Sequence, residues 1–167
     1  MLNQILEGII NILRSFPFII LMILVFPVSR IIVGTTIGTT ATIVPLSISA
    51  APFVARVIEE ALKKVDKGVV EASLAMGATV RQIIFKVLIP EAMPSLVSGI
   101  TLTVINFIGY SAMAGAIGGG GLGNLAIRYG LYGFQTDIMV VSVIIIIILV
   151  QGIQLFGNKL AHKLNKK

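Results

Sequence analysis

Between Glu91 and Arg128 the chain runs for thirty-six residues without a charged side chain. This differs strongly from a soluble domain, in which about a quarter of the residues are charged. Across all 167 residues only 12% are charged and 56% are hydrophobic, so other uncharged runs accompany this one. Because apolar runs of about twenty residues match the length of a helix that crosses a bilayer, we predict an all-α integral membrane protein.

The uncharged runs predict a bundle of four transmembrane helices. The first covers Ser15 to Ser29 and must extend past Arg30, because these fifteen residues rise only about 22 Å as a helix, against a hydrocarbon core of about 30 Å. The second runs from about Ile37 to Ala55 and contains Pro45 and Pro52. Carbonyls freed by proline are tolerated in a membrane only against protein or water, so this helix is expected to face the bundle interior.

The third helix is predicted from Ala92 to about Met113, and the fourth from Ile138 to Asn158, whose isoleucine-rich centre can face lipid. An outer connection lies between them. We expect its glycines, Gly118 to Gly123, to allow close backbone packing or re-entry, and we reject a phosphate-binding loop because a membrane helix precedes them in place of a strand. The connection also contains Arg128, Tyr129, Tyr132 and Asp137.

The orientation of the helices follows from the basic residues. The tail from Lys159 to Lys167 carries four lysines and no acid, which predicts a cytoplasmic C-terminus by the positive-inside rule. Counting back through the helices places the segment from Arg56 to Glu91, with six basic residues, and the N-terminus on the same side. Because basic residues in this pattern act as orientation signals, we expect no nucleic-acid partner. No cleavable signal peptide is expected at the start.

The charged segment from Arg56 to Glu91 has the signals of two short helices joined by a sharp turn. Asp66 can cap a helix over about Lys67 to Met76, and Gly77 can end it with a positive φ. A Thr-x-x-Gln capping box then starts the second helix. Such a segment is either a solvated loop or a rigid projection that fills a cleft in another protein. The apolar face predicted for the second helix consists of Val80, Ile83, Ile84 and Val87.

The segment contains a spaced motif made of Glu71-Ala72-Ser73, Gly77 and the run from Val87 to Pro90. This motif resembles the cytoplasmic coupling loop of ABC importer permeases. Ser73 stands where that family has a second alanine, Val87 replaces an isoleucine and Ile89 a leucine, while the spacing is intact. The resemblance implies that the loop docks on a cytoplasmic ATPase subunit. The matching positions are Glu71, Ala72, Ser73, Gly77, Val87, Ile89 and Pro90.

Further stretches along nearly the whole chain resemble the permease subunits of methionine ABC importers, which are binding-protein-dependent inner-membrane components. They are Arg14 to Ile20, Ile31 to Thr35, Ala50 to Arg56, and Gly109 to Met113. Members of this family usually have five spanning helices, the first of which would precede the segment that opens this chain. Because Met1 falls in an otherwise matched connecting segment, we expect a truncated start rather than a variant that lacks the helix.

The resemblance implies a single permease domain over 1–167, with the coupling loop at 56–91, in a multi-pass protein of the cytoplasmic (inner) membrane. The implied partners are a second copy of the chain, two ABC ATPase subunits that bind ATP and Mg, and an extracytoplasmic substrate-binding protein or lipoprotein, in addition to the lipid bilayer. The implied function is ATP-driven import of an amino acid, methionine, by alternating access. The alternatives are import of another amino acid or small solute, or a scaffold subunit that transports nothing.

What the chain lacks agrees with a subunit that has no catalytic centre of its own. It has no Gly-x-x-x-x-Gly-Lys-Ser/Thr run to hold ATP phosphates, so hydrolysis is expected from a partner. Proton-driven transport is the weaker reading, because from Ala92 to Asn158 the only acid is Asp137, at a predicted membrane edge, and the only histidine is His162 in the tail. Without cysteine, an intramembrane enzyme or a metal site also lacks its parts, and we expect no metal and no cofactor in this chain.

Polar residues in the third helix are candidates for the translocation path, which we expect at a twofold axis between two copies. Intramembrane polar groups of this kind also hold helices together, and both readings stay open. Met113 lies among small residues, where a flexible thioether could close the axis against its twin as a gate, although methionine also serves as packing. The candidates are Ser98, Thr101, Asn106, Tyr110, Ser111 and Met113, and Thr103 shares their character.

Overall fold

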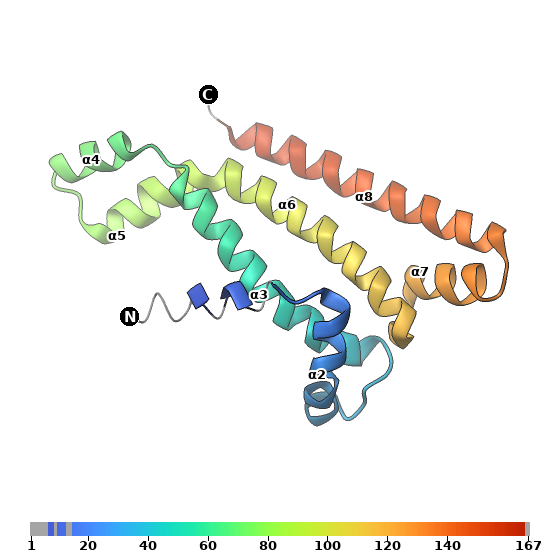
Figure 1. Ribbon diagram of the computed structural model, residues 1–167. Helices are drawn as coiled ribbons and strands as arrows, with labels where there is room; N and C mark the ends of the chain where they lie inside the picture. The colour runs from blue at the N-terminus through green and yellow to red at the C-terminus, as the bar shows by residue number, and fades with distance from the viewer. Residues whose placement is uncertain (1–6, 9, 13–14, 166–167) are drawn as a thin grey trace. The chain divides into compact units, whose positions relative to one another are not determined.

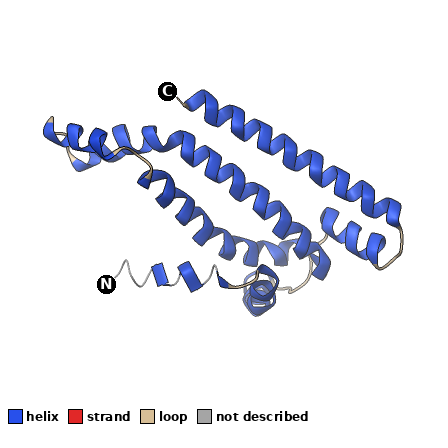
Figure 2. Ribbon diagram, turned by 45° about the horizontal axis from the view of Figure 1, so that its top comes forward, coloured by secondary structure: helices blue, strands red, loops and turns tan. Residues whose placement is uncertain are grey.

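The computed structural model describes residues 7–8, 10–12 and 15–165. The predicted cytoplasmic N-terminus and the last two lysines fall outside this description. Figure 2 shows helices joined by short loops, with no strand in the described part. The elements are α2 (Phe18–Val33), α3 (Thr39–Lys63), α4 (Lys67–Ala75), α5 (Val80–Ile83), η1 (Ile84–Leu88), α6 (Ile89–Ala114), η2 (Gly115–Gly119), α7 (Gly121–Asn124), η3 (Leu125–Leu131) and α8 (Thr136–Leu164), where η marks a π-helix.

Three helical runs in the described part are long and apolar enough to cross a membrane, namely α3, the continuous run Val80–Gly119 and α8. They correspond to the second, third and fourth predicted helices, which confirms the all-α membrane class. The first predicted helix is α2, which continues past Arg30 to Val33 as expected but has only 16 residues. It rises about 24 Å, so it is shorter than a full span.

The second predicted helix ends later than expected. Ala55 was the predicted end, yet α3 continues to Lys63. Arg56 bonds both Glu59 (2.9 Å) and Glu60 (3.1 Å), and Lys63 also pairs with Glu59. Ion pairs at spacings of three and four residues stabilise a helix, so the charges that begin at Arg56 do not end it.

The third predicted helix begins earlier than expected. Helical structure starts at Val80 and reaches α6 through the π-turn η1, where the Ile89 N–H donates to the Ile84 carbonyl. Pro90 follows directly. Because proline has no N–H and its ring crowds the carbonyl four residues back, a wider turn at this place avoids the clash without ending the helix. The second helix of the charged segment is therefore continuous with the membrane helix.

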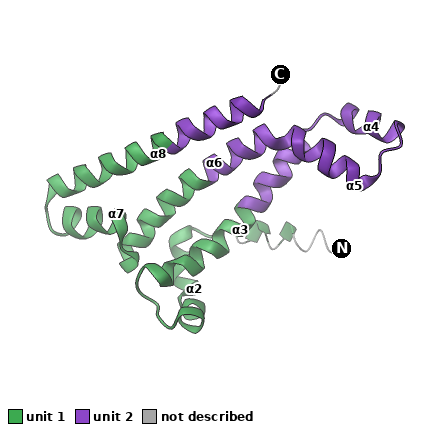
Figure 3. Ribbon diagram, turned by 180° about the vertical axis from the view of Figure 1, so that it is seen from behind, with its two compact units in different colours: residues 1–53, 104–152 green, residues 54–103, 153–167 purple. Residues whose placement is uncertain are grey.

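The described chain divides into two compact units, coloured in Figure 3. Unit 1 consists of residues 1–53 and 104–152, and unit 2 of residues 54–103 and 153–167. In unit 1, Phe18, Met22 and Ala114 form a small buried cluster against which Tyr110 packs. Pro45 and Pro52 are both buried, as expected for a proline-containing helix that faces protein. Only 6% of the most apolar window of α8 is buried, which agrees with the predicted lipid-facing helix.

The outer connection is helical, which the sequence did not predict. Figure 1 shows α7 beside the end of α6, both in unit 1. A Cβ on Gly123 would lie 2.2 Å from the Ala112 carbonyl oxygen, and one on Gly115 would lie 2.5 Å from the Asn124 nitrogen. The Asn124 side-chain amide also donates to the Gly115 carbonyl at 2.9 Å. The glycines therefore permit close backbone packing, the first of the two roles expected for them.

Candidate coupling loop and membrane path

The first helix of the charged segment begins at the predicted cap. The Asp66 carboxylate accepts a hydrogen bond of 2.7 Å from the Gly68 N–H, and α4 starts at Lys67. Such a cap satisfies one of the N–H groups that the first turn of a helix leaves unpaired. The predicted start of this helix is confirmed, and Figure 1 shows α4 and α5 as a hairpin within unit 2.

Gly77 closes the end of α4 with the predicted positive φ, 78°. Its N–H donates to the Leu74 carbonyl at 2.9 Å, and the Ala78 N–H donates to the Ser73 carbonyl at 3.1 Å. This pair of bonds is a Schellman motif, which pairs the last carbonyls of a helix and reverses the chain. A Cβ at Gly77 would meet nothing within 4 Å, so the backbone conformation and not crowding is what requires glycine.

Thr79 and Gln82 form the predicted capping box at the start of α5. The Gln82 N–H donates to the Thr79 hydroxyl oxygen at 3.4 Å, and the Thr79 N–H donates to the Gln82 side-chain oxygen at 2.8 Å. Three local devices, at Asp66, Gly77 and Thr79, thus set the geometry of the hairpin. α4 contacts both α5 and η1, so the two arms hold a defined relation to each other.

The motif residues divide into exposed and structural positions. Glu71 and Ala72 are exposed on α4, and among the described residues the Glu71 side chain has no hydrogen bond or ion pair. Ser73 is buried, and its hydroxyl donates to the Val69 carbonyl at 2.7 Å. The remaining positions lie in the second arm, where Val87 belongs to η1 and Ile89 and Pro90 open α6. Glu71 is therefore available to a partner.

The predicted apolar face of the second arm is only partly correct. Ile83 is buried at 6% exposure and Val87 is half-buried, but Val80 is 72% exposed and Ile84 39% exposed. Helical spacing does place Val80 and Ile84 on the same side of the helix as Ile83. The short α4 can cover only part of that side, so the rest faces outward.

An exposed apolar surface on the hairpin was missed in the sequence. Met76 is 81% exposed and Phe85 62% exposed, in addition to Val80. Phe85 lines a shallow hollow of about 350 Å³ together with Thr79, Arg81, Gln82 and Lys86. Leu74, at 53% exposure, completes what we call the hairpin surface: Leu74, Met76, Val80 and Phe85. The signal that would have revealed it was the presence of large apolar residues beside the turn glycine.

Two of the candidate path residues in α6 take part in packing. Thr101 is buried, donates its hydroxyl to the Val97 carbonyl at 2.7 Å, and lies where a Cβ on Gly157 would approach its oxygen to 2.1 Å. Tyr110 stacks on Phe18 with ring centroids 4.6 Å apart and also contacts Phe107 at 5.2 Å. Thr103, which shares their polar character, is buried and donates to the Gly99 carbonyl.

The other candidate path residues are exposed. Asn106 and Met113 lie on one face of α6, at a separation of seven residues, with Gly109 between them. Met113 is 49% exposed, and a Cβ on Gly109 would meet nothing within 4 Å, so this face is open in a single chain. Ser98 and Ser111 are exposed as well.

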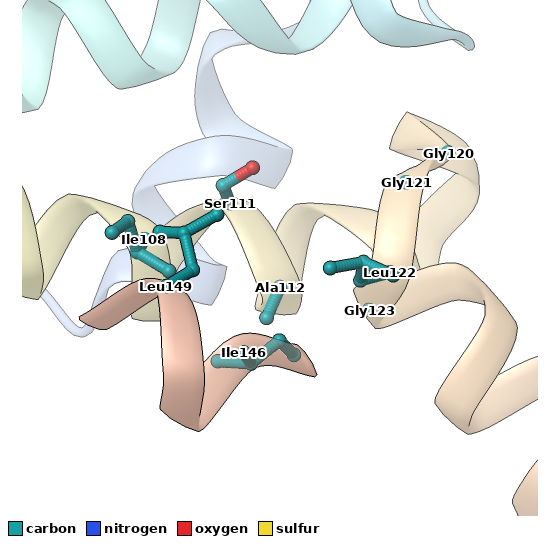
Figure 4. A pocket seen from close by; sticks show the side chains of 9 residues that line it. All are labelled: Ile108, Ser111, Ala112, Gly120, Gly121, Leu122, Gly123, Ile146 and Leu149. Atoms are coloured by element: carbon teal, nitrogen blue, oxygen red, sulfur yellow. The ribbon is translucent and has the colours of Figure 1, made fainter. Parts of the chain in front are cut away.

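Ser111 lines a small crevice of unit 1 between α6, the glycine stretch and α8, with a volume of about 200 Å³ (Figure 4). Apart from this serine its lining consists of aliphatic side chains and glycine backbone: Ile108, Ala112, Gly120, Gly121, Leu122, Gly123, Ile146 and Leu149. A crevice of this size and character adds no charged group to the candidate path. Nowhere in the described part do three or more His, Cys, Asp or Glu residues gather as a metal site would need.

Known proteins have sequences similar to this chain. A family model described as "Binding-protein-dependent transport system inner membrane component" matches residues 1–165. The chain is 52% identical over 166 residues to the probable D-methionine transport system permease protein of Vibrio cholerae, a match that covers 99% of this chain and 74% of that protein. It is 48% identical over 165 residues to the methionine import system permease protein of Bacillus subtilis, with coverage of 99% and 74%.

A solved structure is similar over the same extent. A chain of the MetNI methionine ABC transporter in inward-facing conformations matches with a TM-score of 0.94 and 47% sequence identity, covering 99% of this chain and 76% of that chain. The family match, the identities and the shared fold each extend over nearly the whole chain. The chain therefore belongs to the family of binding-protein-dependent transport system inner membrane components.

Proposed function

We propose that this chain is the permease subunit of an ABC importer that carries methionine across the cytoplasmic membrane. The family membership supports a transport subunit, and the methionine transport for which the Vibrio cholerae and Bacillus subtilis relatives are named supports methionine as the solute. The observation that carries the proposal is the α4–α5 hairpin, in which the matched motif coincides with a rigid, capped turn.

The hairpin is the proposed docking site for a cytoplasmic ATPase subunit, which would bind the ATP and Mg. Its exposed hairpin surface, Leu74, Met76, Val80 and Phe85, is unusual for a solvated loop, and exposed apolar patches of this kind mark protein contacts. Glu71 and Arg81 are exposed beside it and can add charge complementarity to an apolar centre. The Schellman turn gives the projection a fixed geometry, so a displacement of the ATPase is passed to α6.

The continuity of α5, η1 and α6 supports alternating access as the mechanism. Because the helix that follows the docked turn continues into the membrane, movement of the hairpin becomes movement of a membrane helix. Closure of two ATPase subunits around ATP would bring two docked hairpins together. The paired permeases would then change from an inward-facing to an outward-facing state.

The translocation path for the solute is proposed to lie between two copies of the chain. The open face of α6 carries Asn106, whose amide in a membrane needs a partner or water. Gly109 keeps the face flat, and Met113 offers a flexible thioether one turn further, suited to a gate between twin chains. A twofold arrangement places each of these side chains twice around one axis.

The opposite end of the helices is proposed to receive an extracytoplasmic substrate-binding protein. Tyr129 and Tyr132 are exposed in and after η3, and the Arg128 guanidinium lies 5.8 Å from the Tyr129 ring centroid. Aromatic and arginine side chains are enriched at protein contacts. The tail lysines support a cytoplasmic C-terminus, which assigns this end to the outside.

The test of the proposal is uptake of labelled methionine by proteoliposomes that contain the chain, its ATPase and its binding protein. ATP-dependent accumulation supports the proposal, and accumulation of a different solute in place of methionine contradicts the solute assignment. Co-purification of an ATPase whose hydrolysis is stimulated by loaded binding protein separates a transporter from a scaffold.

Glu71→Lys tests the hairpin itself. Because Glu71 is exposed and has no described side-chain partner, its replacement changes the stability of the chain by about 0.5 kcal/mol or less. We expect uptake to fall and the ATPase to dissociate or to hydrolyse ATP without transport. Asp137→Lys is the matched control, because it reverses the charge of a carboxylate in the first turn of α8, outside the hairpin, and should leave the ATPase bound. Retained ATPase and normal uptake in Glu71→Lys would contradict docking at this position.

A further inference from the structure

A large cavity in unit 2 lies where three helices begin or end. It is formed by the end of α3 and the turn after it, the first turns of α6, and the end of α8, and its volume is about 880 Å³. Binding sites for small molecules occupy about 300–1,000 Å³, so the cavity is large enough for a ligand. Neither the hairpin surface nor the open face of α6 includes its lining residues.

Two opposite charges line this cavity without meeting. Lys64 and Glu91 are both lining residues, and in the described part neither takes part in an ion pair or a side-chain hydrogen bond. The third charged lining residue, Asp66, is already engaged as the cap of α4. A positive and a negative group that share a cavity but remain apart are suited to a ligand that carries both charges and bridges them.

Part of the remaining lining is apolar, beside the polar Ser95 and Asn165. Ala61 and Val65 are buried at 3% and 8% exposure, and Met93, Pro94 and Leu164 complete this apolar part. The ligand therefore needs an apolar part next to its two charges. An apolar amino acid such as methionine and a phospholipid both have such a part, and in the phospholipid it lies directly below the headgroup, as glycerol and acyl chains.

The depth of the cavity agrees with a lipid headgroup. α3, α6 and α8 all belong to membrane-capable helical runs, and the cavity lies at the ends that carry Lys63, Lys64 and Lys163. This step rests on the orientation given in the proposed function, which assigns these ends to the cytoplasmic side. Positive residues at that level face the headgroups of the inner leaflet.

We propose that this cavity binds a phospholipid whose headgroup has both a phosphate and a primary ammonium, as phosphatidylethanolamine has. The phosphate faces Lys64, and the ammonium donates to the Glu91 carboxylate. Phosphatidylcholine has no N–H to donate, and phosphatidylglycerol has no cation for Glu91, so each satisfies only one of the two groups. The headgroup would tie the start of α6 to the end of α3.

Lipid retention tests the proposal directly. The full chain with its associated subunits is reconstituted in vesicles of equal parts phosphatidylethanolamine, phosphatidylcholine and phosphatidylglycerol, extracted in detergent, and analysed by mass spectrometry for retained lipid. We expect phosphatidylethanolamine to be enriched over the other two lipids. Glu91→Gln and Lys64→Gln should each reduce that enrichment by up to about fivefold, the effect of one exposed ion pair.

Asp137→Asn is the matched control, because it neutralises a carboxylate in the first turn of α8, outside the cavity. The enrichment of phosphatidylethanolamine by this variant should equal that by the parent chain. Equal retention of all three lipids, or enrichment that Glu91→Gln leaves unchanged, would overturn the proposal. Displacement of the lipid by millimolar free methionine would assign the cavity to an amino acid instead. Retention is measured without transport, so failed uptake with intact enrichment counts against the proposed function alone.

Discussion

The backbone N–H of Ala78 donates to the carbonyl of Ser73 at 3.1 Å, and this bond spans the turn between the two arms of the hairpin. It forms only because Gly77, between these residues, takes a φ of 78°. The last carbonyls of α4 are thereby paired within the chain, and the direction of α5 is determined locally. The exposed side chains around the turn, Met76 and Val80, gain their positions from this one reversal.

Gly77→Ala should weaken the hairpin without disturbing the membrane helices. Positive φ costs a residue with a Cβ about 1–2 kcal/mol, so the equilibrium constant for forming the turn falls by about five- to thirtyfold. The space around Gly77 is open, so no steric clash adds to this cost. We expect lower ATP-dependent uptake and weaker ATPase binding, with membrane insertion unchanged, measured in proteoliposomes and by co-purification.

Two variants serve as controls for that experiment. Gly77→Asn should retain more uptake than Gly77→Ala, because asparagine tolerates the left-handed conformation better. Gly152, in α8, has an ordinary helical φ and open space around it, so uptake by Gly152→Ala should equal that of the parent chain. Equal uptake by Gly77→Ala and the parent chain would show that the turn conformation is not needed for coupling.

Met76→Asp should weaken binding of the ATPase while leaving the chain folded. Met76 is 81% exposed, so a polar replacement costs little stability in the free chain. A buried contact residue at an interface contributes about 2 kcal/mol or more, which corresponds to roughly thirtyfold in affinity. Titration of purified ATPase against the reconstituted permease measures the change. Met76→Leu is the conservative control, and an unchanged affinity for Met76→Asp would remove Met76 from the contact.

Met113→Ala should increase the leak of solute across vesicles that lack ATP. The side chain is half-exposed on the open face of α6, so its shortening widens a path there at little cost in stability. We expect a several-fold rise in passive efflux of preloaded methionine. Val104→Ala is the control, because Val104 is exposed on the opposite face of the same helix. A leak equal in both variants would mean that Met113 does not gate.

Thr101 and Gly157 should be coupled in stability. A Cβ on Gly157 would clash with the Thr101 side chain, so Gly157→Ala alone should destabilise unit 2 by about 1–3 kcal/mol. Adding Thr101→Gly moves the small residue to the other helix and should recover at least about 1 kcal/mol of that loss in a double-mutant cycle. Thermal unfolding in detergent provides the measurement.

The same pair of variants separates packing from transport. If Thr101 only packs, uptake by Thr101→Gly, normalised to folded permease, should stay close to that of the parent chain. Loss of uptake at unchanged stability would place Thr101 in the path, and additive changes in stability would contradict the contact with Gly157.

The membrane class and the local structure of the hairpin follow from the sequence because each depends on neighbours in the chain. A long uncharged run indicates that a helix lies in the lipid bilayer, whichever helices it packs against. The caps at Asp66 and Thr79 and the turn at Gly77 are made by bonds within a few residues, so a short pattern contains all the information. The resemblance to a coupling motif was accessible for the same reason, since its spacing is read along one segment.

Other features depended on contacts that a one-dimensional pattern does not contain. The exposure of Val80 depends on how little of α5 the short α4 covers, and the burial of Thr101 depends on Gly157, which lies fifty-six positions further along. The helical outer connection requires Gly123 to meet the Ala112 backbone. The sequence alone therefore determined the helix caps, through local hydrogen bonds, and the membrane helices, through their uncharged runs. Only the tertiary structure decided which helix faces are covered, because burial is set by the packing of distant segments.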